Sequence, residues 1–314
     1  MQGKSLIAAL FAAAALASAP PGSAANRWGA DYFPNVTLTT QDGKEVKFYD
    51  DLLKGKSVAI NVIYTSCKDE CPLETARLVQ LQRLMGERMG KDIFFYSITI
   101  DPKRDTPKVL KAYAEKFGVG PGWLFLTGRP EDIKAVTKKI GLSRNADSAN
   151  KDGHSASLMV GNEPTGQWMR NSAVDNPQFL ADTMATFLGW RRAGPQTSYA
   201  QAQPISIGKG EFLFQSRCSA CHTIGQGDKM GPDLLGVTSR RERSWLTRYI
   251  VEPDRMLAQR DPIAVALFEK YQQVRMPNLR LGSPDAADVI LYLEKQTTAQ
   301  PKQARARAKT AHAH

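Results

Sequence analysis

The chain has 314 residues, which is long enough for two domains that each bury a core of their own. Hydrophobic residues make up 42% and charged residues 23%, as in soluble globular proteins, and no window approaches the roughly 18 apolar residues of a membrane-spanning helix. Five positive charges of the net charge of +11 lie in the two end segments. The rest of the chain is only mildly basic and lacks the interleaved aromatic residues of a nucleic-acid binder. Nucleic acid is therefore not expected as a partner.

The first 25 residues have the three parts of a secretory signal peptide. Lys4 gives a positive start, residues 6–17 form a short apolar stretch, and small residues follow. Cleavage is predicted after Ala25, with Ala19 as the other candidate. The alternative is an uncleaved signal that anchors the chain. The sequence thus predicts an exported, periplasmic protein that associates with a membrane only peripherally or through this segment.

Residues 26–190 alternate between strand and helix periodicity, which predicts an α/β domain. Residues 57–64 (SVAINVIY) and 92–100 (DIFFYSITI) are continuous apolar runs, typical of strands buried on both faces. The other predicted elements are helices at 72–89, 106–117 and 131–140, a strand at 123–126, a strand pair between 155 and 169, and a helix from 177. This order predicts a mixed sheet.

A polar segment punctuated by proline, residues 191–204, is predicted to be a linker. Residues 205–296 are helical where the pattern is clear, at 208–215, 244–251 and 284–293, which predicts a small all-α domain. Residues 297–314 carry four basic and no acidic side chains and are predicted to form a disordered basic tail.

The four cysteines form two close pairs, Cys67 with Cys71 and Cys218 with Cys221. Two of the four histidines lie in the tail, which leaves one histidine in each domain, His154 and one other. Structural disulfides are the usual role of paired cysteines in exported proteins. Such disulfides mostly stabilise small domains with poor cores, however, and these two domains are large enough to fold without them.

Residues 218–222 (CSACH) match the attachment motif of c-type haem. Two thiols three residues apart on one helical turn can reach the two vinyl groups of the porphyrin. The imidazole of the next residue, His222, can then bind the iron. The spacing therefore indicates a covalent haem site, although the bare motif also occurs by chance.

The surroundings of this motif resemble the small class I cytochromes c over the whole C-terminal domain. The segments that carry the resemblance are 231–234 (GPDL) and 276–279 (MPNL), followed by a capped amphipathic helix. The resemblance implies one haem c, with Pro232 beside His222 and with Met276 as the sixth iron ligand. Met230 and Met256 are competitors for that role, but they are expected to be packing or surface residues.

Cys67 and Cys71 lie where the strand at 57–64 ends and the helix at 72–89 begins. The positive end of a helix dipole is expected to lower the pKa of thiols at this position. Two thiolates and one neutral imidazole form a soft ligand set suited to copper(I). His154 is the only histidine of this domain, but a lone histidine is more often structural or solvated, so the residues alone leave its role open.

Three segments in this domain resemble the Sco/SenC family in identity and order: 64–72 (YTSCKDECP), 101–107 (DPKRDTP) and 154–155 (HS). The resemblance implies a thioredoxin-like fold and one copper ion bound by Cys67, Cys71 and His154. Two positions depart from the family pattern, with Lys68 in place of a proline and Gly153 in place of an aspartate that would orient the imidazole. The segment 101–107 is expected to shape a helix start, with partner contact as the alternative.

Together the resemblances predict a thioredoxin-like α/β domain followed by a small all-α cytochrome c domain. Sco proteins serve in assembly of the binuclear copper centre of cytochrome c oxidase, as copper donors, thiol reductants or both. The expected function is thus that of a copper metallochaperone whose haem relays single electrons, with a respiratory copper enzyme and other electron-transfer proteins as partners. The alternatives are a thiol–disulfide oxidoreductase, with Cys67 and Cys71 catalytic and haem as electron partner, and a plain electron carrier.

Overall fold

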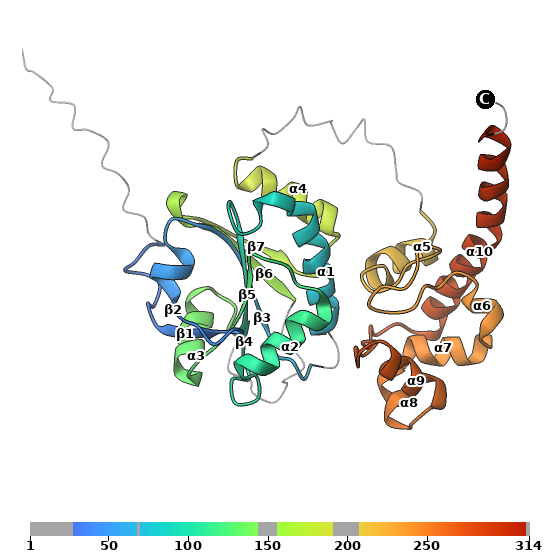
Figure 1. Cartoon of the computed structure of the whole chain (residues 1–314), viewed down its shortest axis with the longest axis horizontal. Coiled ribbons are helices and arrows are strands. Elements are labelled where there is room, and N and C mark those ends of the chain that lie inside the picture. Colours follow the sequence, from blue (N-terminus) through green and yellow to red (C-terminus); the bar gives the residue numbers. More distant parts are fainter. Residues whose placement is uncertain (1–27, 68–69, 144–155, 191–206, 312–314) are drawn as a thin grey trace, which may run out of the picture.

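The computed structural model describes residues 28–67, 70–143, 156–190 and 207–311, and Figure 1 shows their arrangement. The predicted signal peptide, the whole of the predicted linker and His154 lie outside the described residues, as do Lys68 and Gly153. In the described parts of the chain, no helix is both long enough and apolar enough to cross a membrane.

The first domain is built on a seven-stranded sheet of order β2-β1-β5-β4-β3-β6-β7. The strands β3, β4 and β5 pair in parallel, and the outer strands pair antiparallel, so the predicted mixed sheet is confirmed. The short strands β2, at one edge of the sheet, and β1 beside it were not expected from the sequence. The strands are β1 (Thr37–Thr40), β2 (Glu45–Lys47), β3 (Ser57–Ile63), β4 (Phe94–Thr99), β5 (Trp123–Thr127), β6 (Ser157–Asn162) and β7 (Gln167–Ser172).

Helices cover both faces of this sheet (Figure 1). The helices α1 (Glu70–Met85), α2 (Pro107–Phe117) and α4 (Pro177–Phe187) lie on one face. The helix α3 (Pro130–Lys139) and the π-helical turn η1 (Phe48–Leu53) lie on the other. The central strands are therefore buried on both sides, as their continuous apolar sequences predicted.

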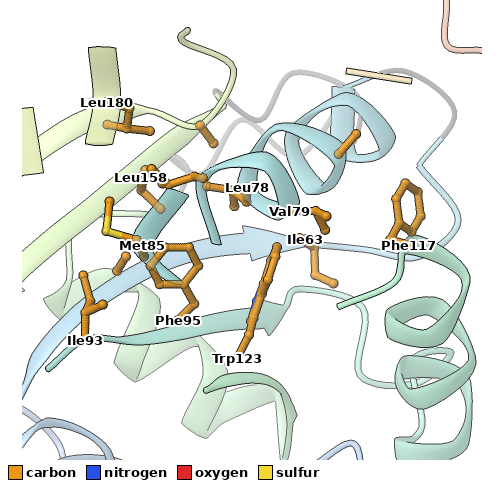
Figure 2. Close-up of a cluster of buried hydrophobic side chains, with 14 of the residues drawn as sticks. Ile63, Leu78, Val79, Met85, Ile93, Phe95, Phe117, Trp123, Leu158 and Leu180 are labelled. Atoms are coloured by element: carbon orange, nitrogen blue, oxygen red, sulfur yellow. The ribbon is translucent and has the colours of Figure 1, made fainter. Parts of the chain in front are cut away.

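Side chains of β3 alternate between the two cores, because successive residues of a strand point to opposite faces. Ala59 and Ile63 belong to the core under α1, α2 and α4, whereas Val58, Ile60 and Val62 belong to the core under α3. Figure 2 shows the first of these cores, in which residues of α1 pack on aromatic side chains of β4 and β5.

Two helix boundaries show how local signals act. The helix α2 starts at Pro107 as predicted, with the Thr106 hydroxyl accepting a hydrogen bond from the Val109 N–H at 3.4 Å. The helix α1 was expected to continue to Met89, but it ends at Met85 and is followed by a 3₁₀ turn. Gly86 has a positive φ of 55°, so the regular α-helical backbone stops there.

No strand occurs among residues 207–311, so the predicted all-α second domain is confirmed. Its core is made by Leu213, Phe214, Leu281, Val289 and Leu293. The helices are α5 (Lys209–Leu213), the π-helical η5 (Phe214–Cys218), α6 (Val237–Arg240), α7 (Arg243–Val251), α8 (Pro253–Ala258), α9 (Pro262–Lys270) and α10 (Ser283–Ala311).

The last helix corrects one prediction about the tail. The helix α10 begins as expected near Pro284 but continues to Ala311, so residues 297–311 are helical and not a disordered arm. Alanine, glutamine, lysine and arginine dominate this segment, and all four have high helix propensity. The lack of acidic residues was therefore a misleading reason to predict disorder.

Candidate metal and haem sites

The first cysteine pair lies at the carboxyl end of β3. Cys67 closes a turn, with its N–H donating to the Tyr64 carbonyl at 3.1 Å, and Cys71 lies in the first turn of α1. The Cys71 N–H donates to Cys67 Sγ at 3.5 Å, which places the two residues side by side. Both cysteines are buried, with exposed fractions of 7% for Cys67 and 0% for Cys71. A single cation could therefore contact both sulfurs after only local rearrangement.

The protonation state of Cys71 differs from the expectation. Burial raises the pKa of the Cys71 thiol, and the hydrogen bond with Cys67 and the negative charge of Glu74 raise it further. The sequence predicted a lowered pKa from the helix dipole, and that prediction is wrong for Cys71 in the metal-free protein, since desolvation outweighs the dipole. A bound cation would reverse the balance, because coordination deprotonates a thiol outright.

The first turn of α1 is held by side chains from its own helix and from α2. The Thr75 hydroxyl donates to the Cys71 carbonyl at 2.9 Å, and the Tyr113 hydroxyl lies 3.0 Å from that of Thr75 and 3.3 Å from the same carbonyl. Burial raises the pKa of Tyr113 well above its ordinary value, so its hydroxyl stays protonated and can donate. The backbone of Cys71 is thus fixed from two helices.

Asp105 anchors the loop that carries Cys67, a role that the sequence analysis missed. Its carboxylate is fully buried and accepts hydrogen bonds from the Thr65 N–H at 3.0 Å, the Thr65 hydroxyl and the Thr99 hydroxyl. Thr65 is two residues before Cys67, and Thr99 ends β4. The segment 101–107 does shape the start of α2, but it also ties the ends of β3 and β4 together. The signal was an acidic residue just before the Thr-Pro helix start.

His154, the third predicted copper ligand, lies outside the described residues. Within the parts of the chain that the structure describes, no cluster of three or more histidine, cysteine or acidic side chains could hold a metal ion. The structure therefore brings Cys67 and Cys71 together, and the third ligand stays a prediction.

The second cysteine pair lines a cavity in the helical domain. Cys218 ends η5, and both the Cys221 N–H and the His222 N–H donate to its carbonyl, at 3.1 and 3.0 Å. Cys218, Cys221, His222 and Met276 all line a cavity of about 330 Å³. This volume lies in the range of about 300–1,000 Å³ typical of cofactor sites. Four predicted haem-site residues, separated by up to 58 positions, are thus brought together.

His222 is oriented as an iron ligand would have to be. Its Nδ1 lies 2.9 Å from the Pro232 carbonyl, which leaves Nε2 free to bind a metal. Burial lowers the pKa of His222, which favours the neutral imidazole that a metal requires. Gly231 touches the ring so closely that an added Cβ would lie 2.6 Å from its Cε1. The placement of Pro232 beside the histidine agrees with the class I cytochrome resemblance, and these residues fit a haem.

The structure distinguishes between the three methionines that could bind the iron. Met256 is fully buried and does not line the cavity, as expected for a packing residue. Met230 lines the cavity but adjoins Gly231, which contacts His222. Met276 also lines the cavity, 54 positions after His222 in the sequence, and it stays the predicted second ligand that would bind the iron together with His222.

Asp233 closes the loop between the haem motif and Pro232, and it too was missed as a structural residue. Its carboxylate accepts hydrogen bonds from the Thr223 hydroxyl and from the backbone N–H groups of Gly225, Gln226, Gly227 and Leu235. Burial acts to raise its pKa, but these donors outweigh burial and hold the pKa well below its ordinary value. A stable carboxylate thus keeps the loop in the conformation that orients His222.

A thioredoxin-like domain with a buried dithiol at the start of a core helix, followed by a helical domain with a haem-attachment cavity, defines a two-domain redox protein. Residues 25–188, just over half of the chain, match the SCO1/SenC family, and residues 207–297 match the cytochrome c family. The chain therefore belongs to the SCO1/SenC family and carries a C-terminal cytochrome c domain. Both resemblances inferred from the motifs are confirmed.

Individual relatives match the first domain. Protein SenC of Rhodobacter capsulatus is 30% identical over 171 residues, which cover 53% of this chain and 73% of that protein. A SCO2-like protein of Rickettsia felis is 41% identical over 93 residues, 30% of this chain, and the chain spans only 44% of that protein's length. A solved structure of Arabidopsis thaliana ScoI with copper bound is 25% identical, with a TM-score of 0.43, over 51% of this chain and 99% of that one.

Proposed function

We propose that this protein is an exported copper metallochaperone and redox protein, which helps to assemble or maintain the copper centre of a respiratory enzyme such as cytochrome c oxidase. One haem c on the second domain would exchange single electrons with one copper ion on the first. Membership of the SCO1/SenC family and the presence of a cytochrome c domain support both halves of this proposal.

Cys67 and Cys71 would hold the copper ion, with His154 as the third ligand. Two sulfurs and an imidazole form a donor set that suits copper(I). Burial of both cysteines disfavours free thiolates and limits access by a partner's disulfide, so the structure supports metal binding more than thiol–disulfide exchange. Cys218 and Cys221 would form the thioethers of the haem, and His222 and Met276 would bind its iron.

The observation that carries the electron relay is the position of Leu73. This residue is the second after Cys71 on α1, and its side chain lines the same cavity as Cys221 and His222. Leu73 and Ala220 of the haem motif also belong to one apolar cluster. The helix that begins at the dithiol therefore reaches the haem cavity within its first turn.

The electron count favours copper over the dithiol as the partner of the haem. A copper ion held by the first domain would exchange one electron, as would a haem on the second, so a transfer between them would balance in either direction, whereas a dithiol–disulfide couple needs two electrons. Leu73 and Ala220 would fill the space between the two centres and exclude water from it, which is the contribution that the chain itself makes.

The proposal is tested by metal analysis and rapid mixing of protein matured with haem in an oxidising compartment. We expect one copper ion and one haem per chain, and copper-dependent kinetics at the haem absorption band. The His154→Ala variant should lose most of its copper and keep its haem. Wild-type protein that retains no copper would refute the copper assignment. Full thiol-reductase activity in that variant would instead favour the oxidoreductase, which needs no imidazole.

A further inference from the structure

The two domains meet where α1 packs beside the haem motif. The Arg77 guanidinium donates from Nη2 to the Gln215 carbonyl, and Gln80 donates from Nε2 to the Ser219 carbonyl at 3.1 Å. Arg77 also donates from Nη1 to Gln80 Oε1 at 3.2 Å, which couples the two anchors. Side chains of the copper domain therefore bind the backbone of the segment that carries the haem cysteines.

A groove runs along this contact and is lined by one sign of charge. Arg77 and Arg83 of α1 face it from the first domain and Lys229 from the second, and none of its described lining residues is acidic. Burial lowers the pKa of Lys229, and the positive charges of Arg83 and Arg77 lower it further across the domain boundary. Docking thus brings like charges together, which opposes the contact.

Arg77, which lines this groove, has a buried donor that is unpaired among the described residues. Its side chain is only 3% exposed, yet its Nε–H has no hydrogen-bond partner among the described residues. An unpaired buried donor costs free energy and calls for a ligand. Asn176 and Pro177, at the N-terminus of α4, also line the groove. The first N–H groups of this helix, those of Gln178 and Phe179, donate to Asn176 Oδ1, so the helix contributes its dipole and not open donors.

We propose that this groove binds a tetrahedral oxyanion of the phosphate or sulfate type. The anion accepts a hydrogen bond from Arg77 Nε and pairs with Arg83 and Lys229, so it bridges the two domains. It offsets the repulsion between them and stabilises the docked arrangement in which Leu73 lines the haem cavity. This site goes beyond the proposed function, because it would regulate domain contact whether or not the client is a copper enzyme.

Titration calorimetry with inorganic phosphate on the full copper- and haem-loaded chain tests the proposal, with ionic strength held constant by sodium chloride. We expect one phosphate per chain, with at least tenfold weaker binding in Arg83→Gln and in Lys229→Gln. Arg83 is exposed, so its replacement should leave the fold intact, as circular dichroism would show. The matched control is Arg88→Gln, an exposed arginine paired with Asp92 outside the groove, which should bind phosphate as the wild type does.

Small-angle scattering provides the second measurement. We expect phosphate to lower the radius of gyration of the wild type more than sodium chloride at equal ionic strength, and Arg83→Gln to lose this difference. Equal compaction by both salts would show general screening and overturn the site. Absence of phosphate binding, or binding unaffected by both groove variants, would also overturn it. Copper and haem content, measured on the same samples, report separately on the proposed function.

Discussion

Replacing Asp105 by alanine should destabilise the first domain and weaken its hold on copper. The carboxylate is fully buried and accepts three hydrogen bonds, two from Thr65 and one from Thr99. Alanine removes both acceptor oxygens, and with them all three hydrogen bonds, and leaves the Thr65 N–H without this partner. Because Thr65 is two residues before Cys67, the loop that carries the first thiol should also lose its fixed position.

The magnitude follows from the kind of hydrogen bond that is lost. A hydrogen bond to a charged group contributes about 1.5–3 kcal/mol, and such contributions within one network are not additive. The two threonine hydroxyls can rotate towards other acceptors, so we expect Asp105→Ala to lower the free energy of unfolding by about 3–5 kcal/mol. Asp105→Asn keeps an acceptor for the Thr65 N–H and the Thr99 hydroxyl, so we expect a loss of only about 1–2 kcal/mol.

Urea unfolding followed by tryptophan fluorescence measures these losses, and a competition titration with a copper(I) chelator measures copper affinity. Supporting residues around metal ligands typically contribute a factor of about 10–100 in affinity, and we expect a loss in that range for Asp105→Ala. Asp101→Ala is the matched control, because the Asp101 side chain makes no hydrogen bond to the described residues. The reasoning fails if Asp105→Ala is as stable as this control, or if the asparagine variant is as unstable as the alanine variant.

Two further predictions concern the haem domain. Gly231→Ala places a Cβ 2.6 Å from His222 Cε1, so the imidazole ring must move. The haem should stay covalently attached, but its reduction potential, measured by redox titration, should shift. An unchanged potential would contradict the inferred orientation of His222. Hydrogen bonds from the Asp233 N–H, Tyr271 and Lys270 lower the pKa of Asp228 from 3.8 to about 2. Its charged form therefore stabilises the fold above about pH 4, and this stabilisation is lost as the pH falls from about 4 to 2. Asp228→Asn should flatten that part of the stability profile in urea unfolding followed by haem absorbance.

Much of the architecture follows from local patterns in the sequence. Apolar runs such as 57–64 and 92–100 can be buried only between two layers, so they predicted the central strands. Thr106 and Pro107 marked the start of α2 because capping and a restricted φ act over a few neighbouring residues. The spacing of Cys218, Cys221 and His222 likewise depends on one helical turn. These features were predictable because their physical causes lie within a short stretch of chain.

Other predictions failed where a local rule competed with tertiary contacts or with composition. The helix dipole alone would lower the pKa of Cys71, but packing against Tyr64 and Cys67 desolvates the thiol and raises it. The basic composition after residue 297 indicated a solvated arm, but the same residues have high helix propensity and extend α10. For Cys71 the competing effects are the helix dipole and desolvation, and for the tail they are basic charge and helix propensity. The sequence alone does not show which effect is the larger.

The sequence by itself determined the two domains, the two families and the two close cysteine pairs, because each of these depends on periodicity or on short motifs. Only the tertiary structure decided which distant side chains meet. Asp105 reaches Thr65 across 40 positions, Leu73 enters the haem cavity of the other domain, and Arg77 binds the backbone of Gln215. Burial and pKa are set by such long-range neighbours, since they depend on how much water is excluded around a group and not on its place in the chain.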